Sequence, residues 1–109
     1  MIWWLLLLLQ QPHRLYHRET IEQLAAGRVP WPYVETTGRV RLVRLEDDGD
    51  LHIKLSGVTA YVVLEVIPEM PLARPTVGTR IRAFGIARED KEHHWFELHP
   101  LVRWEAIPP

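Results

Sequence analysis

The chain has 109 residues, which is enough for one domain, and its 47 % apolar and 25 % charged content is that of a globular protein. Its 13 basic and 14 acidic residues give a net charge of −1, so no overall positive charge attracts it to a polyphosphate chain. It contains no cysteine, which excludes disulfides, thiolate nucleophiles and cysteine-based zinc sites.

Residues 1–12 are an apolar N-terminal segment in which every position from Ile2 to Leu9 is apolar. This run is well short of the roughly 20 residues that a membrane-spanning helix needs. It is as long as the apolar part of a signal peptide, but no basic residue precedes it and no small-residue cleavage site follows. Three interpretations stay open: a buried segment or a wrongly assigned start, a degenerate export signal, and an anchor that meets a membrane or a protein partner through Trp3 and Trp4. Both a cytoplasmic and an exported bacterial location fit.

Residues 13–32 predict a short helical extension and a proline-rich lead-in. Thr20 precedes the stretch IEQLAA, and Gln23 follows three residues later, which is the pattern of a capping box. Gly27 is a natural end for a helix of about two turns. The stretch VPWPY then carries two prolines that favour an extended chain.

From Tyr33 onward the sequence predicts five short strands. The first shifts its alternation after Leu42, with Leu42 and Leu45 counted as inward positions, and this shift indicates a β-bulge. The turn EDDGD follows, and later come a charged loop AREDKEHH, a bend at Gly85 and an interruption at Pro100. The predicted strands contain GRVRLVRLE, LHIKL, TAYVVLEVI, TRIRAFGIA and WFELHPLVRWEAI.

Five short strands with bulges fit a closed barrel, which leaves no sheet edge exposed. The predicted fold class is all-β with a small α content: a five-stranded OB-like Greek-key barrel over residues 33–109, preceded by a short N-terminal helix. An SH3-like barrel is the main alternative.

Four stretches carry a resemblance to a known family: EDDGDLHI, VVLEVIP, PTVGTRI and DKEHHWFELHPL. Together they resemble the pattern of a family of small, uncharacterised bacterial OB-like domains, over roughly residues 34–104. The resemblance implies an OB-like barrel and brings no known activity with it.

The stretch HHWFELHP carries the candidate metal ligands. In a strand, Trp95, Glu97 and His99 point to one side, which we expect to be the outside, whereas Phe96 and Leu98 face the core. A histidine and a carboxylate on one face can bind one zinc-like ion if a third ligand converges. We therefore assign His52, Glu97 and His99 as candidate ligands of one divalent metal ion, which Glu65 or Asp50 could complete. The alternative is that these side chains only form hydrogen bonds and that no cofactor binds.

Arginines and aromatic residues give a candidate nucleic-acid surface. OB barrels bind single strands between two loops, but here these loops, EDDGD and AREDKEHH, are acidic and repel phosphate. Nucleic-acid binding is therefore an alternative and not the first expectation. The candidate surface comprises Trp31, Tyr33, Arg39, Arg41, Arg44 and Trp95.

No catalytic residue is assigned. Ser56 is the only serine, and neither a nucleophile motif nor a phosphate-binding loop occurs. The sequence favours a non-catalytic OB-like binding or interaction module, of a kind that can be a subunit of a larger assembly. A metal-binding, potentially hydrolytic, domain is the second interpretation, and a single-strand nucleic-acid binder is the third.

Overall fold

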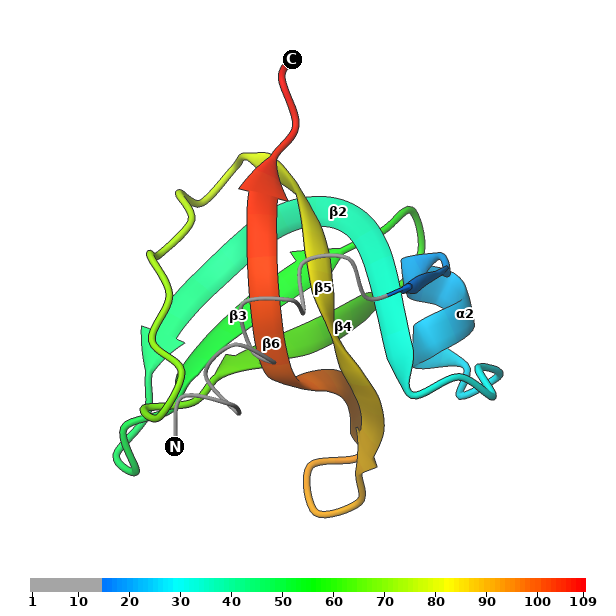
Figure 1. The fold of residues 1–109 in the computed structure, drawn as a ribbon, viewed down its shortest axis with the longest axis horizontal. Helices are drawn as coiled ribbons and strands as arrows, with labels where there is room; N and C mark the ends of the chain where they lie inside the picture. Colours follow the sequence, from blue (N-terminus) through cyan, green and yellow to red (C-terminus); the bar gives the residue numbers. More distant parts are fainter. Residues whose placement is uncertain (1–14) are drawn as a thin grey trace, which may run out of the picture.

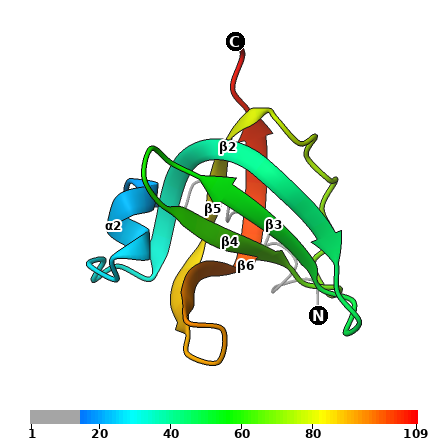
Figure 2. The ribbon, with the colours of Figure 1, turned by 180° about the vertical axis from the view of Figure 1, so that it is seen from behind.

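The computed structural model describes residues 15–109 and shows a closed barrel of five strands with one short helix beside it (Figures 1 and 2). This confirms the predicted all-β class and the short N-terminal helix. The predicted apolar segment, including Trp3 and Trp4, lies outside the described residues. The elements are β1 (His17–Arg18), α2 (Ile21–Ala25), β2 (Tyr33–Leu45), β3 (Leu51–Ser56), β4 (Tyr61–Val66), β5 (Arg80–Asp90) and β6 (Trp95–Ala106).

The barrel closes because β2 pairs with two strands. β2 pairs antiparallel with both β3 and β5. β3 also pairs antiparallel with β4. β6 completes the barrel by pairing parallel with β4 and antiparallel with β5. The strands β3 and β4 form one side of the barrel and β5 and β6 the other, as the two opposite views show (Figures 1 and 2). The two-residue strand β1, which the sequence did not predict, adds to β2 in parallel.

The bulge in β2 lies earlier than predicted. The register with β3 shifts between Val40 and Leu42, which makes Arg41 the extra residue. Leu42 therefore lies opposite Lys54 and points outward with 44 % of its surface exposed. The prediction that Leu42 and Leu45 face the core is wrong, because the bulge changes the alternation before Leu42 and both side chains are exposed.

The predicted charged loop at residues 87–94 is also mostly wrong. β5 continues to Asp90, and its last residues pair with β6, including Arg88 opposite Glu97. Only residues 91–94 form the turn. Charged residues on an outward strand face and charged residues in a loop look alike in sequence, which explains the error.

Gly85 allows β6 to cross β5 closely. The register shifts on both sides of Gly85, and a Cβ atom there would lie 2.7 Å from the carbonyl oxygen of Pro100. This confirms the bend predicted at Gly85. The interruption predicted at Pro100 is confirmed, because the pairing with β5 passes from Leu98 to Leu101 across a register shift, and β6 then runs on to Ala106.

The helix α2 closes one end of the barrel (Figure 1). Thr20 and Gln23 form the predicted capping box, and Gly27 follows the helix with φ of +70°. Ile21 and Leu24 point into the hydrophobic core, which the strands line with Val, Ile and Leu side chains.

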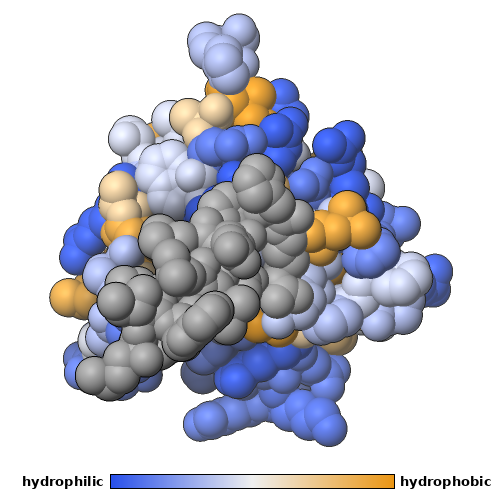
Figure 3. Space-filling view, in the orientation of Figure 1, coloured by the Kyte–Doolittle hydropathy of each residue, from blue (hydrophilic) through white to orange (hydrophobic). Residues whose placement is uncertain are grey.

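The outer surface of the described residues is mostly hydrophilic on the face that Figure 3 presents, where hydrophobic residues form small separate groups. Among residues 15–109, no helix has the length and hydrophobicity that crossing a membrane requires.

Candidate functional site

A cleft of about 580 Å³ lies between the turn at residues 46–50 and the turn after β5. Its floor is formed by side chains of β3, β4 and β6, and its walls are strongly acidic, with seven carboxylates against two arginines. The lining residues are Arg44, Glu46, Asp47, Asp48, Asp50, His52, Glu65, Arg88, Asp90, Glu92, His93, Trp95 and His99.

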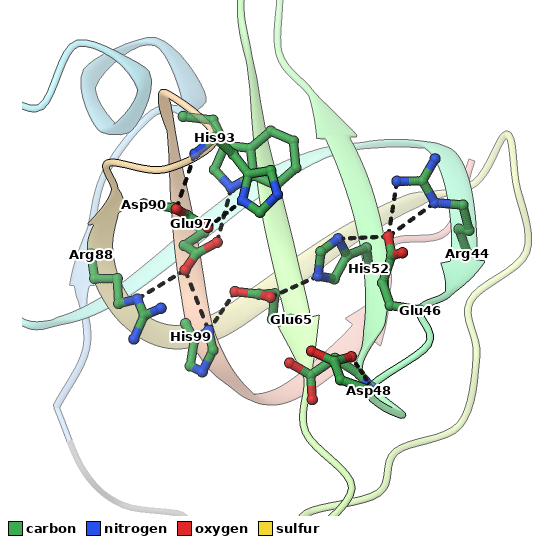
Figure 4. Close-up of polar contacts among 12 residues, drawn as sticks. Arg44, Glu46, Asp48, His52, Glu65, Arg88, Asp90, His93, Glu97 and His99 are labelled. Carbon is green, nitrogen blue, oxygen red and sulfur yellow. Dashed lines mark hydrogen bonds and ion pairs between the residues drawn. The ribbon is translucent and has the colours of Figure 1, made fainter.

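Glu65 is at the centre of the cleft floor. It lies on β4 between β3 and β6, directly opposite His52, and only 5 % of its surface is exposed. Its Oε1 lies 2.7 Å from Nε2 of His52, and its Oε2 contacts Nδ1 of His99 (Figure 4). The other ring nitrogen of His52, Nδ1, lies 3.1 Å from Oε1 of Glu46, outside good hydrogen-bond geometry.

Glu97 lies beside this group and is almost completely buried, with 2 % of its surface exposed. It points to the same side of β6 as Trp95 and His99, as predicted, but the expectation that it is solvent-exposed is wrong. Nε of Arg88 donates to its Oε1 at 2.9 Å, and Nε1 of Trp95 donates to its Oε2 at 3.0 Å. These side chains, together with Nδ1 of His99 at 3.3 Å from Oε1, enclose the carboxyl group.

The two buried carboxyl groups have pKa values shifted in opposite directions. Burial and a hydrogen bond with Glu65 raise the pKa of Glu97. Burial also acts to raise the pKa of Glu65, but hydrogen bonds from Glu97 and His99 outweigh it and lower the pKa overall.

Asp50 adds a further carboxylate at the edge of the site. Burial, together with repulsion from Asp48 and Glu65, raises its pKa. Within residues 15–109, no side-chain or backbone group donates a hydrogen bond to its carboxylate, whereas its own amide donates to Oδ1 of Asp48 at 3.0 Å. Within this part of the chain its carboxylate oxygens have no hydrogen-bond donor.

Of the predicted metal ligands, His52 and His99 line this cleft and Glu97 lies buried beside it, and they do not form a single group. Asp50, His52 and Glu65 form one group, and Glu65, Glu97 and His99 form another. The donor atoms of each group lie within 4.8 Å of one another. Glu65, which the sequence offered only as an additional ligand, is the residue that the two groups share.

The predicted nucleic-acid residues are spread over different parts of the surface. Arg44 and Trp95 lie at the acidic cleft, and Arg44 pairs with Glu46 at 2.8 Å. Arg39 and Arg41 line a separate cleft of about 410 Å³ beside α2. Trp31 stacks on His17 with ring centroids 4.0 Å apart, and the half-buried Tyr33 packs edge-on against Tyr16. These six residues do not form one continuous binding surface.

Two residues of the site were assigned to the wrong kind of element by the sequence reasoning. Arg88 and Asp90 were assigned to a loop, although their alternation along β5 is the signal that could have placed them on one strand face. A further hollow of about 210 Å³ lies on the outer face of β2, β3 and β4, where Nζ of Lys54 lies 4.1 Å above the ring of Tyr61. Its lining includes Arg44 and His52, which the sequence had already indicated as candidate binding residues. Leu42 and Trp95 complete this hollow.

Comparison with known protein families finds no family model that matches the chain. No curated protein matches it either. The resemblance to uncharacterised bacterial domains therefore remains a prediction.

Several solved structures share the fold. The hypothetical protein ygiW from E. coli aligns with a TM-score of 0.60 and 11 % identity, over 84 % of this chain and 90 % of its own. The telomere capping protein Ten1 from Schizosaccharomyces pombe aligns with a TM-score of 0.58 and 13 % identity, over 84 % of this chain and 81 % of its own. The asparaginyl-tRNA synthetase of Entamoeba histolytica aligns with a TM-score of 0.64 and 12 % identity, over 86 % of this chain.

This chain corresponds to only 24 % of that synthetase and to 21 % of a putative aspartyl-tRNA synthetase from Leishmania major. At such low identities the likeness concerns the fold alone. It establishes that the barrel is an OB fold, as predicted.

Proposed function

We propose that this chain is a non-catalytic OB-fold binding module that holds a divalent metal ion in the acidic cleft. OB barrels bind their ligands on the face between the first hairpin loop and the loop before the last strand. Here these loops are residues 46–50 and 91–94, which flank the cleft. The cleft therefore occupies the position at which this fold ordinarily binds ligands.

The observation that carries the proposal is the convergence of imidazole and carboxylate groups on Glu65. His52 and Glu65 oppose each other on neighbouring strands, and Asp50 lies within 4.8 Å of both donor atoms. Zinc and related ions take imidazole nitrogen and carboxylate oxygen together, whereas calcium and magnesium prefer oxygen alone. The surplus of carboxylates in the cleft attracts a cation and repels phosphate.

Among the described residues that line the cleft there is no serine, threonine or lysine that could act as a nucleophile. Ser56 lies at the far end of β3, where its hydroxyl accepts a hydrogen bond from Arg41 at 2.8 Å and lines the other cleft. This supports a binding role.

The test is calorimetric titration of the metal-free full chain with Zn²⁺, combined with thermal melting. We expect saturable binding and a higher melting temperature, because an ion that binds only the folded state stabilises it. His52→Ala should weaken binding at least tenfold. Asp47→Asn, in the same turn but outside both ligand groups, is the matched control and should bind as the unmodified chain does. Absence of bound metal together with an unchanged melting temperature would contradict the proposal.

A second candidate function is binding of single-stranded nucleic acid on the outer face of β2, β3 and β4. The hollow around Tyr61 and Trp95 offers two aromatic rings with Lys54 and Arg44 beside them, and bases stack on such rings. A telomere capping protein and two aminoacyl-tRNA synthetases are among the proteins that share this fold. The acidic cleft next to the hollow disfavours a long strand, so this is the weaker candidate.

Fluorescence anisotropy with a labelled oligonucleotide tests the second candidate. Binding should be detectable at low salt, weaken with added salt, and weaken further in Tyr61→Ala, since stacking on one ring contributes about 1–3 kcal/mol. Val58→Ala, at an exposed position away from the hollow, is the control. No binding at low salt would exclude this function.

A further inference from the structure

We infer that the cleft holds two divalent ions and that the carboxylate of Glu65 bridges them. This inference rests on the proposed metal-binding function and goes beyond it in number and arrangement. The first ion would be held by Asp50, His52 and Glu65, and the second by Glu65, Glu97 and His99.

The two oxygens of Glu65 already face different histidines. Oε1 lies 2.7 Å from Nε2 of His52, and Oε2 contacts Nδ1 of His99 (Figure 4). The histidines approach from opposite sides, because β4 lies between β3 and β6. A carboxylate with one ligand group at each oxygen is the arrangement that bridges two ions, which in proteins lie about 3.5–4 Å apart.

A single ion accounts for the geometry less well. His52 belongs to one group of donors and His99 to the other, so one ion cannot use both imidazoles without a rearrangement. If an ion occupied only one group, the imidazole and carboxylates of the other group would remain beside it. That second group offers the same kinds of donor atom within the same distance limit. The two groups are chemically alike, since each combines one imidazole with two carboxylates.

Only a small movement is needed to admit the first ion. Bond lengths of about 2.0–2.2 Å in a tetrahedral site separate two donor atoms by about 3.3 Å. The contact between His52 and Glu65, at 2.7 Å, must therefore open by about half an ångström. The ion then takes the place of the hydrogen-bonding proton between the two side chains.

Charged and polar side chains lie behind the ligands His52 and Glu97. Oε1 of Glu46 lies 3.1 Å from Nδ1 of His52, on the ring nitrogen that faces away from Glu65. This carboxylate lies beside the ring nitrogen without a good hydrogen-bond geometry, so it adds negative charge behind His52 and leaves Nε2 to the metal. Arg88 and Trp95 hold Glu97 through hydrogen bonds of 2.9 and 3.0 Å. Side-chain hydrogen bonds thus already orient a ligand of the second ion position.

The experiment counts ions in the full chain. Metal-free protein is titrated with Zn²⁺ by calorimetry, and bound zinc is measured by mass spectrometry after dialysis. We expect two ions per chain, one in His52→Ala, one in His99→Ala and two in the control His93→Ala, whose side chain lines the cleft outside both groups. Circular dichroism confirms that each variant is folded.

The same protein loaded with Mn²⁺ supplies a readout that requires no variant. Two ions bridged by one carboxylate couple magnetically, and their electron paramagnetic resonance spectrum differs from that of isolated Mn²⁺. A stoichiometry of one, or a spectrum of isolated Mn²⁺ only, would overturn the two-ion inference and leave the proposed function intact. Absence of any bound ion would overturn both.

Discussion

The hydroxyl group of Thr36 is enclosed in the barrel. Only 1 % of Thr36 is exposed, and its Oγ1 has no hydrogen-bond partner among residues 15–109. A buried hydroxyl without a partner costs free energy. We expect Thr36→Val, which replaces it with a methyl group of similar shape, to raise the free energy of unfolding by about 1 kcal/mol, as measured by urea denaturation. Thr37→Val, at a half-buried position, is the control and should change stability less. A loss of stability in Thr36→Val would contradict this account.

Asp90 and His93 form an ion pair at the rim of the cleft, with Oδ2 and Nδ1 2.8 Å apart. The hydrogen bond and charge of Asp90 raise the pKa of His93. Asp90→Asn should therefore lower the pKa of His93, which an NMR titration of the ring protons measures. Glu89→Gln removes a charge at the neighbouring position and should leave it unchanged.

The raised pKa of His93 determines how this ion pair changes the stability of the protein with pH. The favourable pairing is fully present at pH values below the pKa of an unfolded-state histidine, and it is lost as the pH rises through the higher folded-state pKa. Asp90→Asn should remove this pH dependence. An unchanged titration of His93 in that variant would show that Asp90 does not hold its proton.

The helix α2 depends on its cap. Oγ1 of Thr20 accepts a hydrogen bond from the amide of Gln23 at 3.0 Å, and the Gln23 side chain accepts one from the amide of Thr20 at 2.9 Å. Thr20→Ala should lower the free energy of unfolding by about 1 kcal/mol, because it leaves a helix amide unpaired. Thr20→Ser keeps the acceptor and should lose less in the same denaturation experiment. Equal stability of both variants would mean that the cap contributes nothing.

Local patterns predicted most of the elements. Alternation located β3, a nearly continuous apolar run located β4, and the capping box located α2. The end of β5 was missed because Arg88 and Asp90 carry charges on an outward strand face, which resembles a loop. β1 was missed because two residues offer no period, and the pairing with β2 depends on contacts far along the chain.

The candidate site was predictable only in part. The spacing of Glu97 and His99 placed them on one side of a strand, and this was visible from alternation alone. The central position of Glu65 depends on the parallel pairing of β4 with β6, and no local pattern encodes that pairing. Glu65 and His99 are 34 residues apart in sequence, so their contact follows from barrel closure.

Residues 1–12 bear on whether the whole chain self-associates. This segment lies outside the described residues, and its apolar run with Trp3 and Trp4 favours self-association or a protein partner. We expect the full chain to have a larger mass in solution than a version that lacks residues 1–12, as measured by size-exclusion chromatography with light scattering. Identical monomer masses would show that the segment does not drive assembly.

The double pairing of β2 has a consequence for how the barrel opens. Arg39 lies opposite Ser56 of β3 and also opposite Arg80 of β5, so the two halves of the barrel share this point of the chain. Neither half can detach without disturbing the other, and the amide of Val40, which donates to Thr79 at 2.9 Å, lies at the junction. We expect Val40 to be in the slowest class in native-state hydrogen exchange, with a free energy of opening equal to that of global unfolding, whereas Arg18 in β1 exchanges earlier. The junction would then be the last part of the protein to lose its structure.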